Sequence, residues 1–543
     1  MMMKGLTSLP EKWKNAAGCL AAFLIPFCSI MIIRILMMNG GEISIDGFYH
    51  AGMGKLGPGV FTAKQFPWTD LAIWKTTFAD KELLYHFILW LIFRFQEMLG
   101  FSTGVPFHFA ASVFLALVCG AWVYALKAYK VPFSLMCAGG LLLPFSAPNW
   151  TYRLVMLRPH VLSLAFILFI IGFMARKMSF KWRCIVVGVT SFLYCWSYSN
   201  PHFIVLPVLF FALFQFRNEG KKMLLLPLLS FVSVMLGLIL HPQMPNTFQI
   251  WKLQSWDAMF APMLASMQSA RPSEMLPPGL IWLSTIVPLL LLGFYTLYLL
   301  IRRIERGGWK FVDPGVYALA LLAFGFLGGT FLVMRSIEYG GPLTVLLFLI
   351  LIWQAWRDGL PPLQWGGSVR RVMLPVLLVT ILISVFSMVL AVVDGRKGVR
   401  YPPEKMAAWM KENLYKGEVV VNLDWSDFAQ LFYASPDQYY LWGLDPVFAQ
   451  YANPRKVKML IYTRDPMRRP LHYAYIGKMF RSRYAVILYP RVPHAAYLAS
   501  AGWKLKKEFR RDDGRPEGWI FALDEREAIQ LPHSLIQMDP QGK

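Results

Sequence analysis

Cysteine is scarce in this chain and is absent from its most polar part. The hydrophilic region after residue 394 contains no cysteine, so neither a disulfide framework nor a thiolate zinc site is indicated there. The same region lacks a Gly-rich phosphate loop of the Rossmann or Walker type, which argues against nucleotide chemistry of its own. The six cysteines all fall within or at the ends of apolar segments: Cys19, Cys28, Cys119, Cys137, Cys184 and Cys195.

Acidic residues are also few, with 31 Asp and Glu against 54 Lys and Arg, and the net charge is +23. The excess basic residues cluster in short connectors between apolar runs and not on one contiguous face, which argues against nucleic-acid binding. Charged residues make up only 16% of the 543 positions, whereas 56% are hydrophobic. A soluble domain of this length could not bury so much apolar surface, so we expect a polytopic α-helical membrane protein.

Apolar runs long enough to cross a bilayer predict about eleven spans. A further run at 83–99 carries His86, Arg94, Gln96 and Glu97, and we interpret it as a juxtamembrane or re-entrant helix. With that run outside the bilayer core, every basic connector falls on the cytoplasmic side, as the positive-inside rule requires. The first run follows three lysines and is interpreted as an uncleaved signal anchor. The predicted spans are 16–38, 107–126, 131–148, 154–175, 184–199, 201–216, 223–240, 279–301, 314–334, 340–356 and 371–393.

This orientation leaves three polar parts on the outer side of the membrane. They are the loops 39–82 and 241–278 and the C-terminal region. We therefore predict a transmembrane domain at 1–393, a linker at 394–398 and a periplasmic, outward-facing α/β domain that ends at 543. In that domain we expect helices at 402–414, 427–433 and 493–502 and strands at 418–422, 484–489 and 519–523.

Asp46 and His50 follow the first span at the membrane surface. If the segment is helical, their spacing of four places both on one face, where they could jointly hold a divalent metal ion or a substrate hydroxyl. A carboxylate there could also act as a general base toward an acceptor. The alternative is interfacial, with Asp46 as a helix N-cap and Tyr49 and His50 as headgroup anchors.

Asp80 and His86 close the same loop. An acid and an imidazole that return to the surface near Asp46 would complete a catalytic polar cluster. The alternative is that Asp80 only caps the helix that begins at Leu83.

Arginines at the outer ends of spans form a third group. Guanidinium groups at that depth are costly unless they are paired, and a phosphate or diphosphate headgroup suits their bidentate donors. The alternative is snorkelling or pairing within the bundle, for instance of Arg335 with Glu338. The residues lie in two outer turns, Arg153, Arg158 and His160 in one and Arg335, Glu338 and Tyr339 in the other.

Glu274 is predicted to lie outside as well, and we count it among the substrate-binding candidates. His202 and His241 each adjoin a proline at a helix end. Turn geometry therefore explains these two histidines as well as catalysis does.

Several local segments and the order of these features carry a resemblance to a known family. These segments are 46–50, 157–160, 200–202, 241–246, 335–339, 422–425 and 443–446. The chain resembles the GT-C superfamily of membrane glycosyltransferases, which take a sugar from a polyprenyl phosphate or diphosphate carrier at the outer or lumenal face. By similarity, Asp46 corresponds to the acidic residue of the first loop that acts as base or metal ligand. The Trp-Trp-Asp motif of oligosaccharyltransferases and the two-acid pair of O-mannosyltransferases are missing, so those acceptor classes are not supported.

The resemblance implies a glycosyltransferase of the bacterial cytoplasmic membrane. Asp46 would be base or metal ligand, supported by His50, Asp80 and His86. Two arginines, Arg158 and Arg335, would clamp the phosphate of the polyprenyl-phosphate-linked donor.

Two other functions remain open. One is a non-catalytic scaffold of GT-C-like fold in envelope assembly. A transporter fits less well, because the candidate groups gather at one face and not at mid-bilayer.

Overall fold

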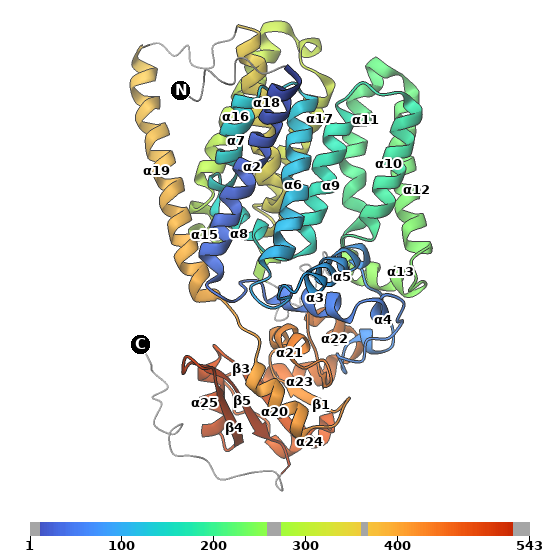
Figure 1. The fold of residues 1–543 in the computed structure, drawn as a ribbon, viewed down its shortest axis with the longest axis vertical. Coiled ribbons are helices and arrows are strands. Elements are labelled where there is room, and N and C mark those ends of the chain that lie inside the picture. Colours follow the sequence, from blue (N-terminus) through green and yellow to red (C-terminus); the bar gives the residue numbers. More distant parts are fainter. Residues whose placement is uncertain (1–10, 258–272, 360–366, 525–543) are drawn as a thin grey trace. The chain divides into compact units, whose positions relative to one another are not determined.

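The structure is a computed structural model that describes residues 11–257, 273–359 and 367–524. The chain forms two compact units (Figure 1). This grouping differs from the predicted division at 394, because residues 44–103 and 241–271 belong with the C-terminal region, whereas the end of the second outer loop belongs with unit 1. Part of the loop 241–278 lies outside the described residues. Unit 1 comprises Met1–Ile43, Gly104–Leu240 and Pro272–Val399, and unit 2 comprises Ser44–Thr103, His241–Arg271 and Arg400–Lys543.

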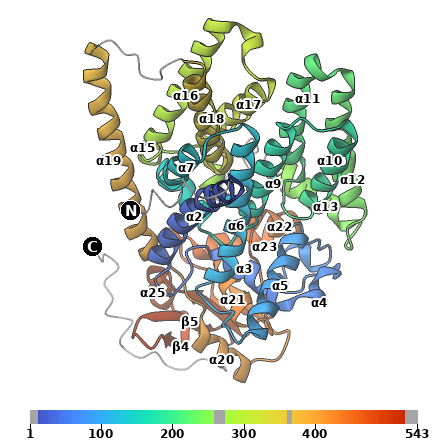
Figure 2. The same cartoon turned by 45° about the horizontal axis from the view of Figure 1, so that its top comes forward.

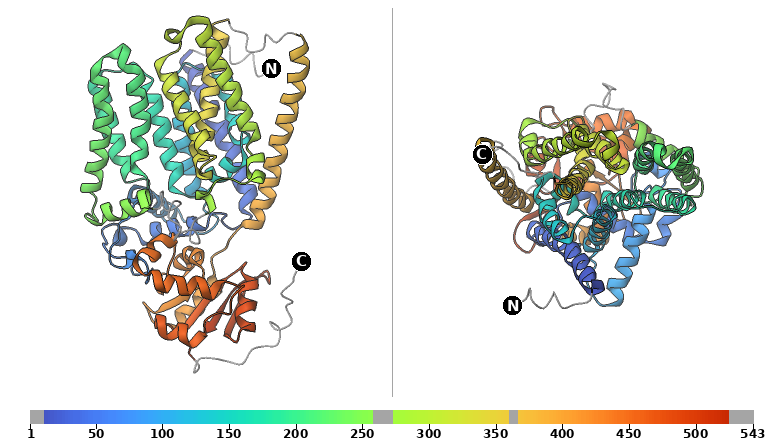
Figure 3. Two further views of the ribbon diagram at one scale, coloured as in Figure 1. Left: turned by 180° about the vertical axis from the view of Figure 1, so that it is seen from behind. Right: turned by 90° about the horizontal axis from the view of Figure 1, so that it is seen from above.

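Unit 1 is a bundle of apolar helices, seen end on in the right-hand view of Figure 3. Its longer helices are α2 (Glu11–Met38), α6 (His108–Ala128), α7 (Phe133–Phe145), α9 (Pro159–Met174), α10 (Phe180–Cys195), α11 (Val205–Glu219), α12 (Leu225–Ile239), α16 (Val287–Gly307), α17 (Pro314–Gly329), α18 (Ile337–Arg357) and α19 (Gly367–Gly398). Its short ones are α8 (Pro148–Leu154), η2 (Pro201–Ile204), η3 (Lys221–Leu224), η7 (Ser273–Met275), α15 (Leu280–Ser284), η8 (Trp309–Phe311) and η9 (Met334–Ser336).

Within the described residues, seven helices are long and apolar enough to cross a bilayer, and the bent pair α8 and α9 makes an eighth. This confirms a multi-pass membrane protein. The other predicted spans coincide with the helices α7, α10 and α17, so the total of eleven stays a prediction.

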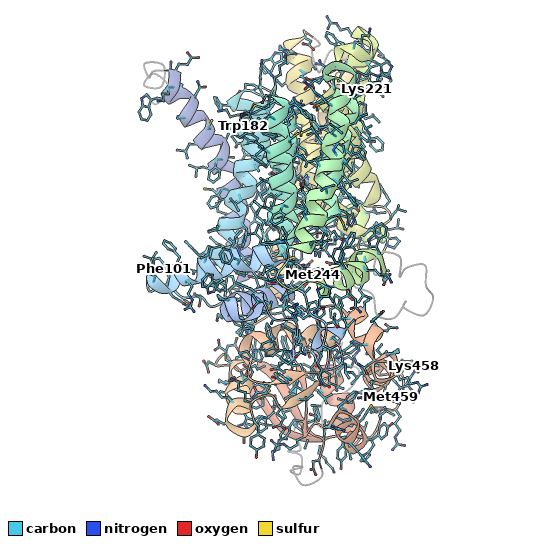
Figure 4. All side chains as sticks on the ribbon, turned by 90° about the vertical axis from the view of Figure 1, so that its right-hand side faces the viewer. Phe101, Trp182, Lys221, Met244, Lys458 and Met459 are labelled. Atoms are coloured by element: carbon cyan, nitrogen blue, oxygen red, sulfur yellow. The ribbon has the colours of Figure 1, made fainter. Side chains whose placement is uncertain are left out.

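The basic connectors lie at one end of unit 1. The turns between α9 and α10, α11 and α12, and α16 and α17 meet there (Figure 1). Figure 4 labels Trp182 and Lys221 at this end. Clustered basic turns are typical of a cytoplasmic face, and the orientation that follows stays a prediction.

Helix α18 lies at the centre of unit 1 and is buried along most of its length. Small residues allow this, because a Cβ at Gly340 would come 2.9 Å from the backbone nitrogen of Leu327 on α17. Close backbone approach through small residues is a common way for helices to associate in membranes.

The predicted linker at 394–398 is wrong, because α19 continues as a helix through Gly398. The end of α19 packs against α2. Arg396 Nε donates to the carbonyl of Leu36 at 2.6 Å, and Gly395 lies against Met37. These contacts stabilise a helical conformation at 394–398, where the amino-acid composition alone predicts a linker.

Unit 2 contains the first loop, part of the second loop and the C-terminal α/β domain, with α3, α4 and α5 close together in Figure 2. Its helices are α3 (Ile45–Leu56), α4 (Pro58–Phe61), η1 (Ile73–Lys75), α5 (Leu83–Met98), α13 (Asn246–Trp251), η4 (Lys252–Asp257), α20 (Glu404–Asn413), η10 (Trp425–Asp427), α21 (Phe428–Ala434), α22 (Pro446–Ala452), α23 (Pro454–Arg464), α24 (Tyr473–Phe480) and α25 (Val492–Ser500). Its strands are β1 (Val419–Asn422), β2 (Tyr439–Tyr440), β3 (Tyr484–Leu488), β4 (Lys504–Arg510) and β5 (Pro516–Ala522).

The sheet has the order β2-β1-β3-β5-β4. The first three strands are parallel, with Val421 opposite Ala485, whereas β5 runs antiparallel to both β3 and β4. Every residue of the central strand β3 is buried. The α/β character predicted for this region is thereby confirmed.

The first loop is attached to the edge of this sheet. Thr69 forms a bridge with Tyr440 of β2, and the amides of Asp70 and Leu71 donate to the carbonyls of Tyr440 and Leu441, both at 2.7 Å. Behind this edge, the ring of Phe66 packs on Phe432 of α21. The loop that carries the candidate catalytic residues is therefore part of the core of unit 2.

Candidate functional site

Helix α3 positions Asp46 and His50. Ser44 is its N-cap and accepts a hydrogen bond from the amide of Gly47, so Asp46 lies in the first turn and is not the cap. Asp46 is half-buried, and His50, one turn later on the same face, is buried. The segment is therefore helical, as the prediction that Asp46 and His50 share one face requires.

His50, His86 and Asp80 form a buried chain of hydrogen bonds. His50 Nδ1 lies 2.9 Å from His86 Nε2, which joins α3 to α5. His86 Nδ1 lies 2.9 and 2.8 Å from the two carboxylate oxygens of Asp80. Asp80 Oδ1 also accepts the amide of Glu82, the N-cap residue of α5, at 3.1 Å, but no side chain caps the first turn of that helix.

The carboxylate at one end of the chain determines the tautomer of both imidazoles. A carboxylate only accepts, so His86 carries its proton on Nδ1 and presents a lone pair at Nε2. His50 then donates from Nδ1, and its lone pair is at Nε2. These hydrogen bonds thus leave the lone pair of His50 on Nε2, where it can accept a proton, and Asp80 would stabilise the resulting imidazolium through His86.

The second loop holds Asp80 in place through its backbone. His241 Nε2 donates to the carbonyl of Asp80 at 3.1 Å, and Gln243 Oε1 accepts its amide. The amide group of Gln243 donates to the carbonyls of Val60 and Ala63. Burial lowers the pKa of His241, against the opposing influence of Asp80, and a neutral His241 donates to a carbonyl. The structure thus gives His241 a supporting role.

Aromatic rings pack against this chain of hydrogen bonds. Tyr49 packs edge-on against His86, with ring centroids 5.7 Å apart. Burial, and then the nearby carboxylates of Asp80 and Glu82, raise the pKa of the Tyr49 phenol well above its usual value. Tyr49 is therefore neutral, and the low polarity around it strengthens the hydrogen bonds of the chain.

A divalent metal at Asp46 and His50 stays a prediction, and His86 would not add a ligand to it. Both ring nitrogens of His86 are used in the chain, so it offers no lone pair to an ion. In the part of the chain that the structure describes, no group of three or more His, Cys, Asp or Glu could hold a metal ion. Two protein ligands are fewer than the three or four of a zinc site, whereas Mg²⁺ is bound through one or two carboxylates together with substrate phosphates.

A second polar cluster lies in unit 1 and joins the two predicted arginine turns. Arg153 donates to Glu338 from Nε at 2.7 Å and to Glu274 from Nη1 at 2.5 Å. Arg335 reaches the same two carboxylates at 3.3 and 3.4 Å, and Arg158 reaches Glu274 at 3.4 Å. The predicted pairing of Arg335 with Glu338 is thereby observed.

A break between two helices creates the arginine turn. Helices α8 and α9 meet at 103°, and Arg158 is the N-cap of α9, directly before Pro159. His160 Nε2 donates to the carbonyl of Arg153 at 2.9 Å, and this backbone carbonyl at the bend thereby has a hydrogen-bond partner. Tyr339 lies deeper, where its hydroxyl is 2.7 Å from Ser163 Oγ.

The cluster carries more positive than negative charge, with the three guanidinium groups of Arg153, Arg158 and Arg335 facing the carboxylates of Glu274 and Glu338. Burial alone would raise the pKa of Glu274, but the surrounding arginines hold it well below its usual value. Arg153 makes the short contacts with the two carboxylates, whereas Arg158 and Arg335 contact the same carboxylates at more than 3.2 Å. The long contacts of Arg335 are weak ones, so its guanidinium could turn toward an added anion.

Sequence reasoning missed one buried ion pair. Arg34, inside the first apolar run, donates to Glu42 at 2.6 Å, and the two side chains are 1% and 0% exposed. Arg34 also donates to the carbonyl of Val155 at the helix break. A charge within a span is the signal that could have pointed to this pair.

Comparison with solved structures shows the fold. The oligosaccharyltransferase AglB of Archaeoglobus fulgidus matches over 95% of this chain and 75% of its own, with TM-score 0.57 and 12% identity. ArnT of Cupriavidus metallidurans, bound to undecaprenyl phosphate, matches over 96% of this chain and 100% of its own, with TM-score 0.54 and 12% identity. The mycobacterial arabinofuranosyltransferase AftD matches over 95% of this chain and 42% of its own, with TM-score 0.52 and 14% identity.

AglB has also been solved in complex with dolichol-phosphate and, separately, with Zn and sulfate. No protein-family model and no curated protein sequence matches this chain. The fold is that of the GT-C membrane glycosyltransferases, as the sequence resemblance predicts.

Proposed function

We propose that this protein is a glycosyltransferase that moves a sugar from a polyprenyl-phosphate-linked donor to a hydroxyl acceptor at the outer face of the bacterial cytoplasmic membrane. The observation that carries the proposal is the buried chain from Asp80 through His86 to His50. The GT-C fold supports it, since neighbours of this fold are transferases and one was solved with undecaprenyl phosphate.

In this proposal His50 is the general base. As the acceptor oxygen attacks the anomeric carbon, its proton passes to His50 Nε2. The positive charge that develops on the imidazoles is stabilised by Asp80 through His86. Asp46, one turn before His50, would orient the acceptor by accepting a hydrogen bond from a second hydroxyl group. This modifies the expectation that Asp46 is itself the base.

The bond that breaks joins the anomeric carbon to the phosphate oxygen, so the polyprenyl phosphate leaves with one more negative charge. Arg158 and Arg335 would bind that phosphate, because the cluster in unit 1 has a surplus of positive charge. Stabilising charge that develops on the leaving group lowers the barrier to transfer.

The test uses the full-length protein in lipid nanodiscs with a panel of synthetic undecaprenyl-phosphate-linked sugars and an envelope extract as acceptor. We expect transfer from at least one donor by the wild type, a strong loss with His50→Gln, and no loss with the control His472→Gln, an exposed histidine of unit 2. Absence of transfer from every donor, or equal transfer by both variants, would overturn the proposal and favour the scaffold.

A further inference from the structure

Helix α5 has one face buried within unit 2 and an opposite face that is apolar and open. The buried face carries His86 and packs on α3, where a Cβ at Gly54 would come 2.9 Å from Leu89. The open face follows the spacing of three and four residues that unites side chains along a helix. A large apolar strip on a surface marks a site that binds another apolar phase. The half-buried and exposed apolar residues of this face are Leu84, Phe87, Ile88, Leu91, Phe95 and Met98.

The apolar strip continues beyond the end of the helix. Met98 is 72% exposed, and Phe101, which Figure 4 labels, is 59% exposed. The turn that carries them is ordered, because Gln96 Nε2 donates to the carbonyl of Ser102 and the amide of Phe101 donates to the carbonyl of Gln96, both at 2.8 Å. Large apolar side chains held open to water on an ordered segment are unfavourable, so we expect this strip to be covered.

The chain keeps the strip near the bilayer. Residues 99–107 separate α5 from α6, and residues 39–44 separate α2 from α3. Helices α2 and α6 are both long and apolar enough to cross a membrane. A connector as long as 99–107 reaches about 30–35 Å when fully extended, and the folded turn after α5 shortens it. The bilayer is therefore an apolar phase within reach of α5.

Charged groups at the end of the strip fit the membrane surface and not the hydrocarbon core. Arg94 lies beside Phe95 and pairs with Glu97 at 2.9 Å, and both charged side chains are exposed. The stem of an arginine can lie on apolar surface while its guanidinium stays among the headgroups. A re-entrant helix would carry this pair into hydrocarbon, where charged groups are costly. The open face thus suits a helix that lies in the plane of the membrane surface.

We infer that the open face of α5 lies on the lipid bilayer, at the boundary between headgroups and acyl chains. The first loop is then bound to the membrane by lipid contact as well as through its two ends. The same helix carries His86, which bonds His50 and Asp80, so the bilayer also helps to position that chain of hydrogen bonds. The effect on His86 matters for transfer only under the proposed function, whereas the lipid contact does not depend on it.

The test is photolabelling of the full-length protein in nanodiscs that contain a phosphatidylcholine with a diazirine in its acyl chain. Tryptic peptides are then analysed by mass spectrometry. Peptide 82–94 carries most of the open face, and peptide 372–396 of α19, which includes most of a candidate span, is the positive control. Peptide 459–464 of α23, with its exposed Tyr462, is the negative control. We expect 82–94 to be labelled at least tenfold more than 459–464.

A double variant checks that the strip itself makes the contact. Leu91→Gln combined with Met98→Gln replaces two exposed apolar side chains, and labelling of 82–94 should fall at least fivefold at equal thermal stability. Met467→Gln is the matched control, because it changes an exposed methionine of the C-terminal domain, and it should be labelled as the wild type is.

Two results would overturn the inference: labelling of 82–94 no greater than that of 459–464 while 372–396 is labelled, or unchanged labelling in the double variant. Labelling confined to the monomers of a sample that also contains dimers would overturn it too, since a second copy of the chain would then cover the face. A protein that is labelled at 82–94 but transfers no sugar would refute the proposed function and leave the lipid contact standing.

Discussion

Asp80→Asn separates a proton relay from a merely structural cluster. The substitution keeps the shape of the side chain and its capacity to accept a hydrogen bond from the amide of Glu82. It removes the negative charge that contacts His86 at 2.8 and 2.9 Å in a fully buried position. An amide can also donate to His86 Nδ1, which reverses the tautomer of His86 and then that of His50. In the reversed state the outer nitrogen of His50 carries a proton and cannot accept one.

The magnitude follows from both effects. A hydrogen bond to a charged group contributes about 1.5–3 kcal/mol against about 0.5–1.5 kcal/mol for a neutral one, which alone gives about a five- to tenfold loss. Loss of a competent general base lowers rates by about 10²–10⁴-fold. We expect transfer by Asp80→Asn to fall by at least about 10²-fold, with the affinity for donor unchanged.

The assay is initial transfer rate against donor concentration, with the full-length protein in nanodiscs. Asp70→Asn is the matched control, because Asp70 lies in the same loop but pairs with the half-exposed Lys75 at the surface. A rate for Asp80→Asn within threefold of the wild type, at equal thermal stability, would refute the relay. Equal losses by Asp80→Asn and Asp70→Asn would show that only the fold of the loop matters.

Three further predictions concern other parts of the chain. Arg158→Met and Arg335→Met should each raise the KM for donor by about 10- to 150-fold, since each loses a charged contact of about 1.5–3 kcal/mol. Unchanged donor titrations would contradict the phosphate role. Arg34→Met should destabilise unit 1 by about 3–5 kcal/mol, because it leaves Glu42 buried without its ion-pair partner. The double variant Arg34→Met with Glu42→Leu should regain most of the lost stability, as measured by thermal unfolding. An Arg34→Met variant as stable as the wild type would contradict this. The pKa of Asp427 is about 7 in the folded state and near 4 in the unfolded state. The folded state therefore binds one more proton between these values, so the free energy of unfolding falls as pH rises from about 4 to 7. Asp427→Asn should flatten this dependence of stability on pH, and equal slopes for variant and wild type would exclude the effect.

Sequence patterning predicts those elements of the C-terminal domain whose side chains are mostly apolar. The run 484–489 matches the wholly buried β3, and 418–422 matches β1. Strand β4 was not predicted, because its sequence Lys-Leu-Lys-Lys-Glu-Phe-Arg exposes one charged face at the sheet edge and buries mainly Leu505 and Phe509. The two-residue β2 has no pattern of its own and depends on its neighbours.

The candidate site is only partly visible in the sequence for a similar reason. The spacing of Asp46 and His50 predicts a shared helical face because it is local. The bond between His50 and His86 joins two helices, and the bonds of Gln243 join residues about 160–180 positions apart. No periodicity encodes such contacts, since they arise only once the loops fold on each other.

The bridge between Thr69 and Tyr440 has a consequence for any attempt to dissect the protein. A fragment that starts at residue 394 would expose the unprotected margin of β2 and the rings of α21, a surface prone to self-association. A chimera that exchanges the polar part between relatives must therefore carry the stretch 44–103 along with the C-terminal portion. Loosening this attachment would also relax the helix that holds His50, so under the proposed function substitutions in the sheet would change the transfer rate without altering His50, His86 or Asp80.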